Sequence, residues 1–340
     1  MISGNKKQLK FLLFGLLILF FLLDLYLGSI TIPLVDIIKI LSLQEPRNPI
    51  WTTIVLDFRL SKAVTSILAG AALSVSGLQM QTLFRNPLAG PDVLGLSSGA
   101  SLAVSLVFLS GATGFSLFSN PGPLSVAIAA SLGSFLIMLA VVAIAGKVKS
   151  STSLLIIGLM IGATTSSIVS ILQFLSGADQ QQSFLIWTFG SVGGLNWTEI
   201  AILALVLGLG TLGAVFSIKS LNAWLLGDHY ATSLGIHLKS ARIRMIISTC
   251  LMTGAVTAFC GPIAFIGIAI PHVTKLLLRT SEHKVLIPWV AVTGATILLM
   301  CDLIAQLPGS AHVLPINAIT AFIGAPIIIW IILRGNKVIA

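Results

Sequence analysis

Residues 124–145 read LSVAIAASLGSFLIMLAVVAIA, an apolar run without a charged residue between Gly122-Pro123 and Gly146-Lys147. About 20 apolar residues in a helix are enough to cross the hydrocarbon core of a bilayer. Comparable runs recur along the chain, at about 9–28, 60–83, 93–110, 153–175, 199–217, 243–258, 263–278, 286–304 and 315–333. The sequence therefore predicts an all-α polytopic membrane protein with ten transmembrane helices.

The composition supports the same class. Hydrophobic residues make up 56% of the 340 residues, charged residues only 9%, and the mean hydropathy is +1.06. A soluble domain carries about a quarter charged residues, so this chain has too few to cover a water-facing surface. The runs are continuous and do not alternate, which argues against a β-barrel. The segments between them are too short to bury separate cores, so we expect residues 1–340 to form one membrane domain.

The distribution of positive charge predicts the orientation. Most of the 19 Lys and Arg residues fall at the N-terminus, at the C-terminus or in every second connection. Because cytoplasmic loops carry the excess of Lys and Arg, both termini are predicted to be cytoplasmic. The exceptions lie around the first connection, and they are Lys39, Arg47, Arg59 and Lys62. The net charge of +9 reflects this sidedness and does not indicate nucleic-acid binding.

Two stretches have a special composition. The connection 177–198 is too apolar for a free loop, and we expect a short interfacial helix there with Trp187 and Trp197 as anchors. The fifth run carries small residues four positions apart, which would let another helix approach closely or would line a polar path. These residues are Gly158, Gly162, Ser166 and Ser170.

The sequence lacks the phosphate-binding loop of an ATPase. Gly146-Lys147 is followed by Val148, where a phosphate-binding loop needs Ser or Thr. Cys and His show no spacing typical of a metal site. We expect no catalytic residue, cofactor or metal site, and any ATP and Mg²⁺ would be bound by partner subunits. Asp24 and Asp302 lie toward the outer ends of their runs, near water, and the absence of a midplane carboxylate argues against the alternative of an ion-coupled secondary transporter.

Several motifs resemble those of the permease subunits of binding-protein-dependent ABC importers for iron-siderophore, haem and vitamin B12. The match runs in the family's order from about residue 55 to 330. It includes Arg85-Asn86-Pro87-Leu88-Ala89-Gly90, Leu226-Gly227-Asp228-His229-Tyr230-Ala231, Gly261-Pro262-Ile263-Ala264 and Pro271-His272. The sequence departs from the pattern at Gln306 and Val313, on the predicted outer face.

This resemblance implies a fold like that of the vitamin B12 permease, and a homodimer in the bacterial inner membrane. Two cytoplasmic ATPase subunits would lie beneath the dimer, and an extracytoplasmic substrate-binding protein would deliver the cargo. The motifs are shared by permeases for siderophores, haem and cobalamin, so they leave the cargo open.

The longest predicted cytoplasmic connection, residues 218–242, is the candidate segment for coupling to the ATPases. Gly227 and Gly235 suit breaks around short helices, and Tyr230 and Leu234 lie four apart on one face. The candidate coupling residues are Leu226, Gly227, Tyr230, Ala231, Leu234 and Gly235. A plain amphipathic connector is the alternative interpretation.

Two further sites rest on the resemblance. Thr152 and Ser153 match the pair that closes the inner end of the path in the vitamin B12 permease. A helix N-cap is the competing interpretation, and it is compatible with a gate. Arg59 and Lys62 match basic residues that dock the binding protein. Their alternatives are contacts with lipid headgroups or a pair with Asp57.

Overall fold

The computed structural model describes residues 2–109, 122–148, 150–306 and 313–335. Seven of its helices are long and apolar enough to span a membrane, and three shorter apolar helices complete the predicted ten. The N-terminal half contains α1 (Ile2–Tyr26), α2 (Leu34–Leu41), α3 (Ile50–Thr53), the π-helix η1 (Ile54–Leu60), α4 (Ser61–Phe84), the 3₁₀-helix η2 (Pro91–Leu94), α5 (Leu96–Leu109), α6 (Pro123–Ala145) and α7 (Ser151–Leu175). The C-terminal half contains α8 (Ala178–Thr188), α9 (Trp197–Phe216), α10 (Ile218–Trp224), α11 (Asp228–Ser233), α12 (Leu238–Cys260), α13 (Ile266–Leu278), α14 (His283–Ala305) and α15 (Ile316–Gly335).

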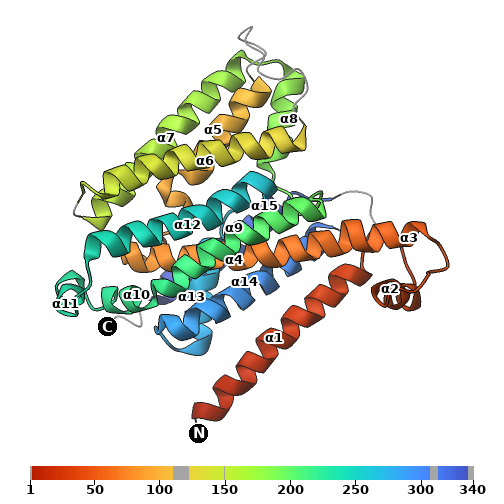
Figure 1. Cartoon of the computed structure of the whole chain (residues 1–340), viewed down its shortest axis with the longest axis horizontal. Coiled ribbons are helices and arrows are strands. Elements are labelled where there is room, and N and C mark those ends of the chain that lie inside the picture. The colour runs from red at the N-terminus through yellow and green to blue at the C-terminus, as the bar shows by residue number, and fades with distance from the viewer. Residues whose placement is uncertain (1, 110–121, 149, 307–312, 336–340) are drawn as a thin grey trace.

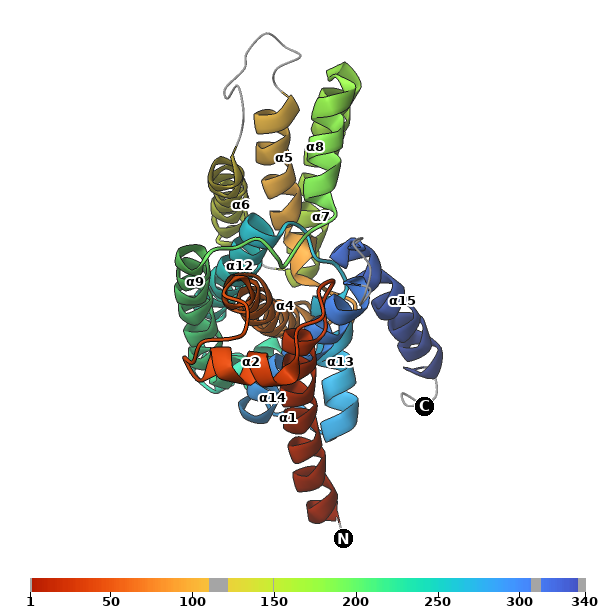
Figure 2. The same ribbon diagram turned by 90° about the vertical axis from the view of Figure 1, so that its right-hand side faces the viewer.

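Helix α4 forms the centre of the bundle. It packs against α9, α12, α13 and α14, and Figure 2 shows it surrounded by them. Nearly all of its residues are buried, including polar ones such as Ser74 and Gln79. The Oε1 atom of Gln79 accepts hydrogen bonds from Ser248 and Thr249 of α12, both at 3.1 Å. A buried amide oxygen that is satisfied in this way fixes the rotation of α4 relative to α12.

Glycines allow α4 to approach its neighbours. A Cβ atom on Gly70 would collide with the carbonyl group of Gly294 in α14, and one on Gly77 would collide with that of Gly267 in α13. Backbones that touch at such points gain van der Waals contact, which is the main attraction available between helices in lipid.

The short helices lie at opposite ends of the bundle. Helices α10 and α11 are at the left end in Figure 1, and α2 and α3 are at the right end. The predicted helix in 177–198 is confirmed as α8, and the interfacial role of its two Trp residues stays a prediction. Trp187 is partly buried and stacks on Phe184 with ring centroids 6.2 Å apart, whereas Trp197 at the start of α9 is exposed.

Candidate functional site

The α10–α11 segment presents an apolar surface at one end of the bundle. Gly227 and Gly235 have positive φ angles of 109° and 78°, so each makes a turn that other residues adopt at a cost. Leu226, Tyr230 and Leu234 are exposed by 64%, 52% and 58%. We call these three residues the α11 patch. The positive φ angles of Gly227 and Gly235, on either side of α11, confirm the predicted breaks at these two glycines.

The segment is fastened to the bundle behind this patch. Ala231 is fully buried, so it supports α11 from within and does not belong to the exposed patch. Arg85, in a left-handed conformation directly after α4, forms an ion pair with Asp228 and donates a hydrogen bond to the carbonyl oxygen of Trp224 at 3.3 Å. The backbone N–H of His283 donates to Asn222 at 2.9 Å. These contacts hold the segment that carries the α11 patch against the C-terminal end of α4 and the start of α14.

The start of α7 carries the predicted gate residues. Ser150 is the N-cap, and its hydroxyl oxygen accepts from the backbone N–H of Ser153. The N-cap interpretation of Thr152 and Ser153 is therefore wrong, because Ser150 holds that position. Both side chains are exposed in the first turn of the helix. Their role in a gate stays a prediction.

The small residues of α7 divide into two pairs. Gly158 and Gly162 face η2 and the start of α5, and a Cβ atom on Gly158 would collide with the carbonyl oxygen of Val93. Ser166 and Ser170 are exposed. The first pair is used for helix packing, and the second lies on a face of α7 that also exposes Met160, Ile171 and Phe174.

At the opposite end of α4 the two predicted docking residues are buried. The Nζ atom of Lys62 lies 3.1 Å from a carboxylate oxygen of Asp24 in α1 and 2.7 Å from one of Asp302 in α14. Both carboxylates are buried too. Asp24 and Asp302 lie near the ends of α1 and α14, as predicted, but the expectation that they are near water is wrong, because both side chains are buried against Lys62.

Arg59 caps the end of α1. Its Nη1 atom donates to the carbonyl oxygens of Leu25 and Tyr26, each at 2.8 Å, and its Nη2 atom donates to that of Ile30. The carbonyl oxygens of Leu25 and Tyr26 belong to the last turn of α1, which ends at Tyr26, so they have no partners within the helix. The predicted alternative of a pair with Asp57 is therefore wrong. We call Asp24, Arg59, Lys62 and Asp302 the charge cluster.

A cavity of about 360 Å³ adjoins the charge cluster, and Gly28, Arg59, Lys62 and Gln306 are among its lining residues. Gln306, one of the two departures from the family pattern, therefore lies beside the charge cluster. The other, Val313, is 69% exposed. Docking of a binding protein by Arg59 and Lys62 stays a prediction. Both side chains already contact carboxylates or carbonyl oxygens of the same chain.

Comparison with known proteins identifies the class to which this geometry belongs. The chain is 33% identical over 288 residues to the hemin transport system permease protein HmuU of Yersinia pestis, covering 83% of this chain and 84% of that protein. It is 35% identical over 288 residues to the vitamin B12 import system permease protein BtuC of Vibrio parahaemolyticus, covering 83% of each.

A solved structure has the same fold. It is described as an inward-facing conformation of a metal-chelate type ABC transporter, and it superposes with a TM-score of 0.83 at 25% identity, covering 96% of this chain and 99% of that one. The FecCD transport family model matches residues 16–334. This polytopic membrane permease subunit therefore belongs to the FecCD transport family.

Proposed function

We propose that the chain is the pathway-forming subunit of an ATP-driven importer for an iron chelate, such as a siderophore or haem, or for vitamin B12. The relatives named for hemin and vitamin B12 support this range of cargo. Two copies would form the path, and separate subunits would bind ATP and Mg²⁺. A binding protein would deliver cargo on the side of α2 and α3.

The α11 patch is the observation that carries the proposal. Its apolar side chains lie outside the long helices, on a segment braced by the Arg85–Asp228 pair. Exposed apolar residues on a braced element are typical of a surface that meets another protein. With both termini in the cytoplasm, as the charge distribution predicts, this surface would meet the ATPase subunits.

The second copy would cover the exposed face of α7. Ile171 and Phe174 lie on this face, and 60% and 89% of their respective surfaces are exposed. A cavity of about 330 Å³ on the same helix includes Met160, Thr164 and Thr165 in its lining. Apposition of two such faces would enclose a path, and Thr152 and Ser153 at the inner end would close it with small hydroxyl side chains.

The test replaces one residue of the α11 patch. Leu234→Asp introduces a carboxylate where the ATPase would bury an apolar side chain, which costs more than 1.4 kcal/mol if the charge stays unpaired. We expect cargo-stimulated ATP hydrolysis, measured in proteoliposomes with the partner subunits, to fall at least about tenfold.

Thr232→Asp is the matched control, because Thr232 is exposed in α11, two residues before Leu234, but lies outside the patch. It should leave stimulated hydrolysis close to the wild-type rate. Normal stimulation in Leu234→Asp, in protein that inserts and dimerises, would contradict the assignment of the patch.

A further inference from the structure

Helices α6 and α9 leave a groove between them. Each packs extensively against α12, and they do not pack extensively against one another. A cavity of about 490 Å³ occupies the space. Small residues of α12 form its floor, and aliphatic and aromatic residues of α6 and α9 form its walls. Among them are Cys250, Gly254 and Ala255 on the floor and Ile128, Phe135 and Ile202 on the walls.

The groove faces the surroundings of the bundle. Helices α6 and α9 are among the least buried of the membrane-spanning helices. Ile128, Phe135 and Ile202 each expose about half of their surface. Apolar side chains at this depth meet hydrocarbon, so a lipid chain can enter the groove from the bilayer.

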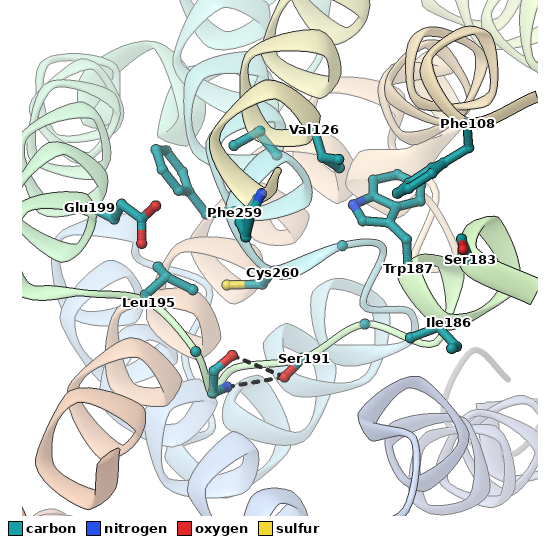
Figure 3. Close-up of a pocket in the computed structure, with 17 residues that line it drawn as sticks. Phe108, Val126, Ser183, Ile186, Trp187, Ser191, Leu195, Glu199, Phe259 and Cys260 are labelled. Carbon is teal, nitrogen blue, oxygen red and sulfur yellow. Dashed lines mark hydrogen bonds between the residues drawn. The ribbon is translucent and has the colours of Figure 1, made fainter. Parts of the chain in front are cut away.

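A second cavity of about 430 Å³ adjoins the groove where α9 begins and α12 ends (Figure 3). Its lining includes polar groups, of which Ser183, Ser191 and Glu199 are examples. Ala127, Glu199 and Phe259 line both cavities. The two spaces therefore adjoin at Glu199, with an apolar region on one side and a more polar region on the other.

Glu199 brings a negative charge to this junction. Its Oε2 atom accepts from the backbone N–H of Asn196 at 2.9 Å, in a reciprocal cap at the start of α9. Within the described part of the chain, no Lys, Arg or His group lies within 4.0 Å of its carboxylate. Exposed Trp197, two residues earlier, is typical of the headgroup level of a membrane.

We propose that the groove holds one phospholipid with a primary-amine headgroup, its chain between α6 and α9 and its ammonium group at Glu199. An ammonium group would donate a charge-assisted hydrogen bond to the free carboxylate oxygen. The groove offers the chain little that bulk lipid does not, because lipid tails are as apolar as the side chains. Selectivity must therefore come from the headgroup.

The test measures lipid binding to the purified full-length chain in detergent by native mass spectrometry. The probes are phosphatidylethanolamine, phosphatidylcholine and phosphatidylglycerol with identical oleoyl chains. We expect one phosphatidylethanolamine per subunit, bound about three- to tenfold more tightly than phosphatidylglycerol. Phosphatidylcholine should bind more weakly than phosphatidylethanolamine, because its quaternary nitrogen has no N–H to donate.

Glu199→Gln separates this role from helix capping, since a Gln side chain makes the same reciprocal cap. It should abolish the preference for phosphatidylethanolamine without changing thermal stability. Asp179→Asn, which removes an exposed carboxylate at the start of α8 on the same side, is the control and should keep the preference. Equal binding of the three lipids to the wild-type chain, or a preference that survives in Glu199→Gln, would overturn the proposal.

A second variant tests the groove itself. Ala255→Phe places a ring on its floor and should weaken phosphatidylethanolamine and phosphatidylglycerol alike, by at least about threefold. Ala201→Phe, on the exposed surface of α9 outside the groove lining, should not. Unchanged binding in correctly folded Ala255→Phe would place the lipid elsewhere and overturn the proposal.

Discussion

The two ends of α4 use positive charge in opposite ways. At its N-terminal end Lys62, together with Arg59 just before the helix, is buried against carboxylates and carbonyl oxygens of other helices. At its C-terminal end Arg85 pairs with Asp228, and both side chains are nearly half exposed. A buried charge must be paired to be tolerated, whereas an exposed one is already solvated. Loss of a charge at the N-terminal end of α4 should therefore reduce the stability of the fold strongly, and loss of a charge at the C-terminal end should reduce it little.

The largest effect is expected from Lys62→Met. This change leaves Asp24 and Asp302 buried without their cation, and removal of one partner from a buried ion pair costs about 3–5 kcal/mol. We expect a large loss of thermal stability in detergent, measured by the unfolding of the purified chain, and low yield from the membrane.

A variant without the three charges of the Lys62 ion pairs is the control for this prediction. Asp24→Asn with Lys62→Met and Asp302→Asn removes all three charges together, and buried ion pairs replaced as a set are often near neutral for stability. The triple variant should therefore regain most of the stability lost in Lys62→Met. Wild-type stability in Lys62→Met would show that Asp24 and Asp302 do not need the Lys62 ammonium group to be buried.

Arg59→Gln should have the next largest effect. It removes the guanidinium group that satisfies carbonyl oxygens of Leu25, Tyr26 and Ile30 at the end of α1. Hydrogen bonds to charged groups contribute about 1.5–3 kcal/mol, so we expect a loss in that range in the free energy of unfolding. Arg59→Lys keeps the charge but lacks the branched donor, and should recover only part of the loss.

These variants also separate structure from docking. Docking driven by charge alone would be preserved in Arg59→Lys, while capping of α1 would be impaired. An unfolding free energy equal to that of the wild type in Arg59→Gln would contradict the capping role and return Arg59 to the docking interpretation.

The same contrast explains what the sequence could predict. The ten apolar helices, the helix in 177–198 and the breaks at Gly227 and Gly235 follow from local composition, and the structure contains them. The orientation and the partners stay predictions, supported by charge distribution and by resemblance. Local patterns determine which segments are helical because each helix satisfies its own backbone groups within the bilayer.

The two ion pairs of Lys62 within the charge cluster could not be predicted in the same way. Asp24, Lys62 and Asp302 belong to three helices far apart in sequence, and only the packing of α1 and α14 against α4 brings them together. The pattern of a helix indicates which of its faces is buried, but not which other helix packs against that face. One available signal was that all three residues fall near the same predicted membrane face, where opposite charges in low dielectric would be expected to pair.

The smallest effect is expected at the exposed end of α4. Asp228→Asn and Arg85→Gln, alone and combined, form a double-mutant cycle on the Arg85–Asp228 pair. Pairs of this exposure contribute about 0.2–1 kcal/mol, because water screens the attraction and two side chains must be ordered to make it. We expect a coupling energy in that range at low salt, measured by unfolding of the purified chain. It should fall in high salt, since both groups are reached by solvent.

The hydrogen bond from Arg85 to the carbonyl oxygen of Trp224 does not involve Asp228, so it is lost only in the variants with Arg85→Gln and cancels in the cycle. A coupling energy of 3 kcal/mol or more, insensitive to salt, would show that this end of α4 is as dependent on its charges as the charge cluster is.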